Sequence, residues 1–447
     1  MTAGKEWKQI LLFSLPIMAG NLLQHLYNMV DGIIVGQFVG EDAFAGIITC
    51  SSLTYLFVAF ALGLSIGVGI VISQYFGAGR QDELPVCIDT SMILLGLVGL
   101  MLTVLSLLFA PVLLRTVLGV PNNIIPFALT YFRIYALGFF FQFIYNAVAA
   151  VLRSLGDSKA VLMFLVVASV LNTVLDLIFV VVFHWSVAGA AIATIIAQAA
   201  CASVAYVYMR KRFPYIKSGK HWNRGISITM TKLGLPVALT QCLVAIGQGS
   251  LQRLVNGFDD TVPGVIAAYG AGMRLDAFVY APTQGFQSGI ASFMGQNIGA
   301  GKLDRVKRGL LVTHVMSLSI TIVMCVFLYA FAGPIVALFG LTGGALLIGI
   351  EQVRFLSMFF WSFSFFATFS GMLQGAGDTI IVSVMSLSSL AIRIVTAYAS
   401  VSFGLLGYNA AWVTFPIGWS LAAIIAATRY LTGGWKKKAV AGELSIE

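Results

Sequence analysis

The stretch QYFGAGRQDEL, residues 74–84, has a near copy in QNIGAGKLDRV, residues 296–306. In both stretches an apolar run ends in Gly-Ala-Gly and is followed by a basic residue, Arg80 or Lys302. A phosphate-binding loop would need Gly-Lys followed by Ser or Thr, and neither copy has it. Two more pairs share a spacing of about 220 residues: SLPIMAG from Ser14 with GLPVALT from Gly234, and LRSLGDSK from Leu152 with LQGAGDTI from Leu373. The shared spacing predicts an internal duplication.

The composition indicates a membrane-embedded protein. Of the 447 residues, 59% are hydrophobic and only 10% are charged, and the mean hydropathy is +0.95. Soluble domains carry about 25% charged residues. Apolar runs of the length that crosses a bilayer, about 20 residues or more, recur along the chain. These runs are too long and continuous for the strands of a transmembrane β-barrel, so an all-α integral membrane protein is predicted.

Twelve apolar runs are predicted to be transmembrane helices. They cover residues 10–36, 46–76, 88–117, 126–152, 160–183, 187–209, 230–256, 263–295, 309–338, 344–372, 379–403 and 407–430. Each copy of the duplication holds six of them, so both copies enter the membrane in the same direction, which makes a parallel repeat. The expected architecture is two pseudo-symmetric six-helix lobes, an amino-terminal one at 1–212 and a carboxy-terminal one at 230–447, with a cytoplasmic linker at 213–229.

The distribution of charge predicts the orientation in the membrane. Lysines and arginines gather in alternate loops and at both ends of the chain, whereas the opposite loops carry Glu41, Asp42, Asp259 and Asp260. Cytoplasmic loops are enriched in basic residues, so both termini and the linker are expected on the cytoplasmic side of the plasma membrane. The net charge of +9 then reflects topology and contact with anionic lipid, and no nucleic-acid partner is expected.

Two acidic residues lie deep within predicted helices of the first lobe. A charged side chain at the centre of the bilayer costs about 2.5–3.5 kcal/mol on insertion scales, so such residues usually have a function. Asp31 shares a helix face with Gln24 and Asn28, and Asp176 follows Asn172 by one turn. The alternative is that these groups only join helices by hydrogen bonds.

Further polar side chains are predicted at the same depth. Thr194 and Gln198 form an i,i+4 pair on one helix, and Tyr131 lies on another. Counted from the predicted outer helix ends, Asp31, Asp176 and Thr194 lie about 10–15 Å below the surface. Such a set of oxygen ligands suits a proton or a hard cation, so a site for H⁺ or Na⁺ is predicted.

The second lobe does not copy this site. By the repeat, Asn172 corresponds to Arg393, and Asp31 falls near Gln252 or Arg253. The charged residues at membrane depth in this lobe are Arg253, Arg274, Asp276, Glu351, Arg354 and Arg393. One interpretation is that they pair as structural ions, Arg274 with Asp276 and Glu351 with Arg354. The other is that this lobe shapes a substrate cavity, with Arg393, Gln252, Arg274 and Asp276 as its residues.

Five motifs in order give the chain a family resemblance: SLP, VDGIIVG around Asp31, GAGR, LRSLGDSK and LNTVLD from Leu171. Over nearly its whole length the chain resembles the multidrug and toxic compound extrusion (MATE) transporters, and most closely their DinF-like subgroup. The resemblance implies alternating-access efflux driven by inward H⁺ or Na⁺. It implies a coupling site in the amino-terminal lobe whose matching residues are Asp31, Asn172, Asp176 and Thr194, with Tyr131 as a further match. It also implies a bend of the first helix at Pro16. The arginines of the second lobe depart from MATE branches that use carboxylates there.

The expected function is therefore secondary active antiport that exports small amphipathic organic compounds in exchange for H⁺ or Na⁺. No enzyme is expected, because the chain has neither an HExxH motif nor an evident nucleophile–base pair. No cofactor is expected either, and the partners are the substrate and membrane lipid, with the protein acting as a monomer. The alternative is a lipid or glycolipid flippase of the same superfamily, which the second-lobe arginines favour and the acidic first lobe disfavours. Substrate identity and the choice between H⁺ and Na⁺ stay open.

Overall fold

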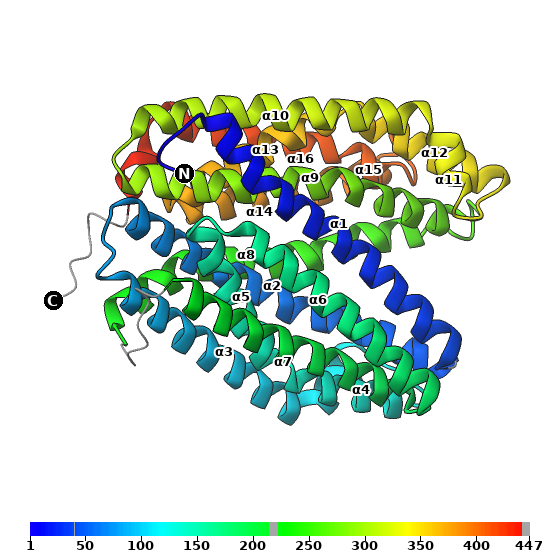
Figure 1. Ribbon diagram of the computed structural model, residues 1–447. Helices are drawn as coiled ribbons and strands as arrows, with labels where there is room; N and C mark the ends of the chain where they lie inside the picture. Colours follow the sequence, from blue (N-terminus) through cyan, green and yellow to red (C-terminus); the bar gives the residue numbers. More distant parts are fainter. Residues whose placement is uncertain (40, 214–221, 440–447) are drawn as a thin grey trace. The chain divides into compact units, whose positions relative to one another are not determined.

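The computed structural model describes residues 1–39, 41–213 and 222–439, and for residues 27–33, 35, 41 and 42 it describes the backbone alone. All regular elements in this part of the chain are helical (Figure 1). The first half contains α1 (Glu6–Phe38), α2 (Glu41–Gly77), α3 (Leu84–Val112), η1 (Leu113–Val117), α4 (Ile125–Leu137), α5 (Phe139–Ser154), α6 (Ser158–Asp176), η2 (Leu177–Val182) and α7 (Ser186–Arg212). The second half contains α8 (Arg224–Asn256), α9 (Val265–Gly299), α10 (Leu303–Ala330), α11 (Ala332–Ala337), α12 (Gly343–Ser357), α13 (Phe360–Ala376), α14 (Thr379–Ser402), α15 (Ala410–Val413), α16 (Phe415–Leu431) and η3 (Gly434–Lys438).

Each of the twelve predicted membrane segments is occupied by one helix or by two consecutive ones. Within the described ranges, nine helices are long and apolar enough to cross a bilayer, and two bent helix pairs raise the number to 11. The remaining predicted segment is α9, whose 35 residues include the charged side chains of Arg274 and Asp276. The apolar runs therefore predicted every membrane helix of the described chain.

The two bent pairs occupy equivalent places in the duplication. The pair α4–α5 bends by 43°, and the pair α12–α13 bends by 51°. Their second helices begin at Phe139 and Phe360, which are 221 residues apart. The sequence predicted each pair as one continuous segment, so these breaks were not foreseen.

The duplication is visible in individual backbone bonds. Gly156 and Gly377 both adopt positive φ, 97° and 88°, which glycine tolerates because it has no Cβ. The next residue in each copy donates its N–H back to a leucine carbonyl: Asp157 to Leu152 at 2.8 Å, and Asp378 to Leu373 at 2.9 Å. The internal repeat predicted from the sequence thus extends to the conformation of single turns.

One compact unit comprises 19–238 among the described residues. Small residues let α2 approach α8 closely here, since a Cβ added to Gly63 would lie 2.2 Å from the Cα of Ala238. Gly67, one turn further along α2, lies against Gly234 in the same way. This small-xxx-small pattern is typical of membrane helices, whose association depends on close packing rather than on a hydrophobic driving force.

The second compact unit comprises residues 239–439 together with Met1–Met18. Its α9 and α13 pack with equal closeness, because a Cβ at Gly371 or Gly375 would meet the carbonyl oxygens of Gln287 and Ala291 at 2.3 and 2.4 Å. The first part of α1 packs against α9, where Gly289 lies against Ser14 and Gly285 against Met18. Glycine therefore recurs at the tightest helix contacts of both units.

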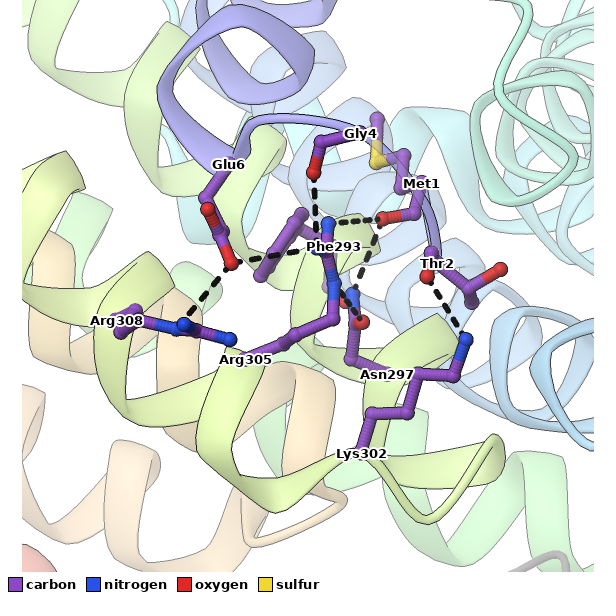
Figure 2. A network of polar contacts seen from close by, with 9 residues as sticks. All are labelled: Met1, Thr2, Gly4, Glu6, Phe293, Asn297, Lys302, Arg305 and Arg308. Atoms are coloured by element: carbon purple, nitrogen blue, oxygen red, sulfur yellow. Dashed lines mark hydrogen bonds and ion pairs between the residues drawn. The ribbon is translucent and has the colours of Figure 1, made fainter.

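Arg305 anchors the beginning of the chain to this second unit (Figure 2). Its Nη1 donates to the carbonyl of Gly4 at 2.8 Å, and its Nη2 donates to the carbonyl of Met1 at 3.2 Å. Its Nε donates to Asn297 Oδ1 at 3.1 Å. One guanidinium thus binds two backbone carbonyls at the start of the chain and one side chain of α9.

Two further contacts extend this attachment. Glu6 Oε1 pairs with Arg305 at 3.3 Å and with Arg308 at 3.4 Å, and Lys302 Nζ donates to the carbonyl of Thr2 at 2.9 Å. The predicted amino-terminal lobe, 1–212, included these first residues. Packing assigns Met1–Met18 to the other unit, because these polar bonds and the Gly285 and Gly289 contacts join them to α9 and α10.

Candidate functional site

Helix α6 carries two of the predicted coupling residues at buried positions. The helix begins after Asp157, whose carboxylate caps the N–H of Ala160 at 3.1 Å. Asn172 is 2% exposed, and Asp176, one turn later, is 0% exposed. After Asp176 the chain continues as the π-helical η2, and π-helical turns often occur at functional sites. The carboxylate therefore lies where the helix changes its winding.

Helix α7 brings a third predicted residue into contact with this pair. Asn172 Nδ2 donates to Thr194 Oγ1 at 3.5 Å, and the Thr194 hydroxyl donates to the carbonyl of Ala190 at 3.0 Å. The structure thus places an amide and a hydroxyl from two helices together, with the carboxylate of Asp176 one turn away on the same helix as the amide.

The supporting residues Tyr131 and Gln198 lie nearby in the same unit. Tyr131 of α4 is half-buried and packs against Val180 and Ala190, and Ala190 is the residue that accepts the Thr194 hydrogen bond. Gln198 is also half-buried, and its Oε1 lies 2.8 Å from where a Cβ on Gly138 would stand. Gln198 therefore fills the bend between α4 and α5.

Helix α1 supplies the remaining predicted residues. The side chains of Asp31 and Asn28 lie outside the described residues, and Gln24 is exposed. Pro16 is half-buried inside α1, where it removes one backbone donor from the helix. The contribution of Asp31 to the coupling site stays a prediction from the sequence.

The carboxy-terminal unit contains a cavity of about 270 Å³. Helices α8, α9, α14 and α16 supply its lining, which consists of Gln248, Gly249, Leu251, Gln252, Tyr269, Met273, Arg393 and Phe415. Gln248 and Gly249 are exposed, so the cavity opens on their side. Gln252 and Arg393 were predicted as cavity residues. Tyr269, Met273 and Phe415 were missed, because aromatic and methionine residues in apolar helices look like core or lipid-facing positions.

Arg393 is the central charged group of this cavity. It is 8% exposed, and its guanidinium carbon lies 3.5 Å from the centroid of the Phe415 ring. Asp276, 1% exposed, interacts electrostatically with Arg393. No ion pair within 4 Å joins the two, and both Asp276 Oδ2 and Arg393 Nε are buried without a hydrogen-bond partner. A buried polar group normally has such a partner. These two atoms can therefore still form a hydrogen bond, Arg393 Nε as a donor and Asp276 Oδ2 as an acceptor.

Two of the predicted cavity residues, Arg274 and Asp276, are not among the residues that line this cavity. Arg274 is exposed, whereas Asp276 is buried, since residues two positions apart on a helix point in different directions. Arg274 therefore neither lines the cavity with Arg393 nor pairs with Asp276. The predicted pairing of Glu351 with Arg354 is also not formed among the described residues. Arg354 instead lies 5.5 Å from the ring centroid of Tyr329.

Comparison with known proteins places the chain in a family. The MatE family model matches residues 16–178 and again 236–399, so its two copies coincide with the two halves of the duplication. The chain belongs to the MatE family. YpnP of Bacillus subtilis, described as a probable multidrug resistance protein, is 30% identical over 391 residues, covering 87% of this chain and 86% of YpnP. YoeA of the same organism, which carries the same description, is 27% identical over 448 residues, covering 97% and 95% of the two chains.

Solved structures of MatE relatives have the same fold. A MOP-superfamily transporter from Pyrococcus furiosus superposes with a TM-score of 0.89 at 25% sequence identity, over 97% of each chain. The predicted two-lobe helical membrane fold and the predicted transporter class are thereby confirmed. As a member of this family, the chain is a multi-pass membrane transporter rather than an enzyme. Its placement in the DinF-like subgroup stays a prediction.

Proposed function

We propose that this MatE transporter is a secondary active antiporter that exports amphipathic organic compounds in exchange for H⁺ or Na⁺. It works by alternating access as a monomer in the plasma membrane, with both termini in the cytoplasm. The coupling site lies in the amino-terminal half, at Asp31, Asn172, Asp176 and Thr194. The descriptions of YpnP and YoeA as probable multidrug resistance proteins support the substrate class.

The observation that carries the proposal is the burial of Asp176 beside Asn172 and Thr194. A carboxylate that is 0% exposed in a membrane helix is costly unless a positive charge or a proton neutralises it. The amide of Asn172 and the hydroxyl of Thr194 add neutral oxygen atoms. Carboxylate, carbonyl and hydroxyl oxygens are the ligands that hard cations prefer, so the side chains present fit Na⁺ as well as a proton.

Neutralisation of the acids supplies the coupling. A transporter conformation that buries the carboxylates is favoured when the ion is bound, and one that hydrates them is favoured after the ion leaves. Each positive charge that moves inward across 100 mV releases about 2.3 kcal/mol. Tenfold uphill export of a neutral solute costs about 1.4 kcal/mol, so a single ion per cycle is sufficient for modest accumulation.

A lipid or glycolipid flippase is the second candidate, because Arg393 offers a buried guanidinium to an anionic head group. A pyrophosphate carries more than one negative charge, however, and the lining of the cavity offers one guanidinium, that of Arg393. The charge balance of this cavity therefore matches a pyrophosphate poorly, and efflux of small compounds is the function we favour.

Reconstituted vesicles test the proposal. We expect a fluorescent amphipathic compound to be exported when a pH or Na⁺ gradient is imposed, and export to fall when that gradient or the membrane potential is collapsed. Asp31→Asn and Asp176→Asn should each abolish gradient-driven export while leaving the amount of folded protein unchanged. Uphill export with both driving forces collapsed would contradict ion coupling. Normal export by both variants would contradict the proposed site.

A further inference from the structure

The cavity of the carboxy-terminal unit is the duplicated counterpart of the proposed coupling site. Residues 221 positions apart correspond, as Asp157 and Asp378 in the repeated Gly-Asp turns show. At this spacing Asn172 corresponds to Arg393 and Thr194 corresponds to Phe415. Asn172 donates a hydrogen bond to Thr194 at 3.5 Å. In the other copy, the guanidinium carbon of Arg393 lies 3.5 Å from the ring centroid of Phe415. The duplication has therefore preserved a contact between the same two helix positions with different chemistry.

The remaining coupling residues have also lost their cation-binding chemistry in this copy. By the repeat, Asp31 falls near Gln252 or Arg253, and Gln252 lines the cavity. Asp176 corresponds to Ala397, which is fully buried in the apolar core. The acid Asp176 is thus replaced by a neutral side chain, while the neutral amide of Asn172 is replaced by the cation Arg393.

Several polar groups of this unit have no partner inside the protein. Arg393 Nε lacks a hydrogen-bond partner, and so do both terminal atoms of Gln352, which is fully buried and corresponds to Tyr131. Gln352 lies against Gly272 of α9, directly before the cavity residue Met273. Buried polar groups in native proteins are usually satisfied by protein, water or ligand. Of these unpaired atoms, the donor Arg393 Nε belongs to a residue that lines the cavity, and it points to a bound group there that accepts hydrogen bonds.

We propose that this cavity binds the carboxylate of an exported aromatic or apolar organic acid, with Arg393 as its counter-charge. The inference rests on the proposed export function and names a substrate class for the carboxy-terminal unit. Arg393 donates to the carboxylate, the amides of Gln248 and Gln252 border the cavity, and the rings of Phe415 and Tyr269 contact the apolar part of the substrate.

Charge and size both favour a small monoanion. Arg393 is the charged residue among those that line the cavity, so a ligand with one negative charge balances its guanidinium. A volume of about 270 Å³ lies just below the usual size of small-molecule sites, about 300–1,000 Å³, so it limits the ligand to a small one. A bicyclic aromatic acid fits such a volume.

Three probes that share one ring system test the charge preference. We would measure binding of radiolabelled 1-naphthylacetate to the purified full-length protein in phosphatidylcholine nanodiscs. Neutral 1-naphthaleneacetamide and cationic 1-naphthylmethylammonium would serve as competitors. The expected result is that unlabelled naphthylacetate competes at least about tenfold better than either analogue, since a hydrogen bond to a charged partner is stronger than a neutral one.

Variants assign the preference to Arg393. Arg393→Gln should weaken naphthylacetate binding at least about tenfold, and Arg393→Lys should retain part of it. Because Arg393→Gln leaves Asp276 uncompensated, the double variant Arg393→Gln/Asp276→Asn removes both charges and should fold while still failing to bind the acid. Arg354→Gln is the matched control, since Arg354 is exposed and lies over Tyr329 away from the cavity, and it should bind as the wild type does.

Three outcomes would overturn the inference. They are equal competition by the acid and the amide, unchanged naphthylacetate binding in the folded double variant, and loss of binding when phosphatidylglycerol replaces phosphatidylcholine, which would assign the cavity to a lipid head group.

Transport assays separate this inference from the proposed function. If Arg393→Gln vesicles still export a cationic compound on a gradient while acid binding never appears, only the substrate assignment fails. If acid binding appears as expected but no gradient drives export, only the export function fails.

Discussion

Arg429 donates from Nε to Asp378 Oδ2 at 2.6 Å and thereby joins the end of α16 to the start of α14. In the other half Tyr208 donates to Asp157 Oδ2 at 2.9 Å. Both pairs span 51 residues, and the two aspartates stand in the repeated Gly-Asp turns of LRSLGDSK and LQGAGDTI. The duplication has kept the acceptor and changed the donor.

Asp378→Ala should destabilise the protein by about 1–3 kcal/mol, the range for removing one partner of a hydrogen bond and leaving the other unsatisfied. Asp378 is buried at 2% exposure, whereas the Arg429 side chain remains 27% exposed and can recover part of its hydration, so the lower half of that range is expected. Thermal unfolding in detergent, followed by labelling of the buried free cysteines, measures the change. Asp304→Ala, at an exposed position of α10, is the control and should change stability by less than about 0.5 kcal/mol. Equal unfolding temperatures for both variants would show that the Arg429 pair adds nothing.

Gly371→Ala should strongly reduce the yield of folded protein. The added Cβ would lie 2.3 Å from the carbonyl oxygen of Gln287, so α13 and α9 would have to separate, and overpacking of this kind costs about 1–3 kcal/mol or more. Gly270→Ala on α9 is the matched control, since a Cβ there meets nothing within 4 Å and alanine favours the helix by about 1 kcal/mol. The ratio of monodisperse to aggregated protein in size-exclusion chromatography distinguishes the two. A Gly371→Ala protein as stable as the control would mean that α13 and α9 adjust without cost.

The sequence predicted the helices well because each crosses the membrane as an apolar run, and burial in lipid leaves little choice of structure. It did not predict the break at Met358–Phe359, where neither glycine nor proline interrupts the run. At the equivalent break in the first half, Gly138 is a weak sequence indication of a helix break. The repeat spacing of 221 residues would have predicted a break at Phe359 from it. The attachment of Met1–Met18 to the unit of Arg305 was also missed, because it depends on contacts between residues about 300 positions apart.

The candidate sites were partly predictable for a similar reason. Asn172, Asp176 and Arg393 are unusual in apolar helices, so composition alone marks them. Phe415 cannot be recognised this way, because a phenylalanine in a membrane helix is ordinary until a guanidinium is found over its ring. Arg274 was misplaced because depth in the membrane was estimated from sequence, whereas the direction of the side chain is set by packing of α9.

Arg305→Ala should release the first residues from α9 and α10. The guanidinium bonds the carbonyls of Met1 and Gly4 as well as Glu6 and Asn297, and no neighbouring side chain can replace all of these bonds. Hydrogen exchange of the peptide that contains the first residues should become faster, while exchange in the rest of α10 should stay unchanged. Arg308→Ala is the control, because Arg308 is 66% exposed and contacts only Glu6 at 3.4 Å, so a small effect is expected. Equal exchange in the two variants would show that Arg305 does not hold this segment.

Thr194→Val should weaken the apparent affinity for the coupling ion about tenfold, with little change in the maximal rate of export. Valine keeps the shape of the side chain but removes the hydroxyl that accepts from Asn172 at 3.5 Å, and one lost ligand oxygen or orienting bond corresponds to about 1.4 kcal/mol. Export would be measured in vesicles at a series of H⁺ and Na⁺ concentrations. Thr173→Val is the matched control, since the Thr173 hydroxyl bonds only the carbonyl of Ser169 on its own helix, at 3.0 Å. A shift in ion dependence for Thr194→Val alone would assign the hydroxyl to the coupling site. If both variants shift equally, or if only the rate of export falls, Thr194 contributes to helix packing and the ion is held elsewhere.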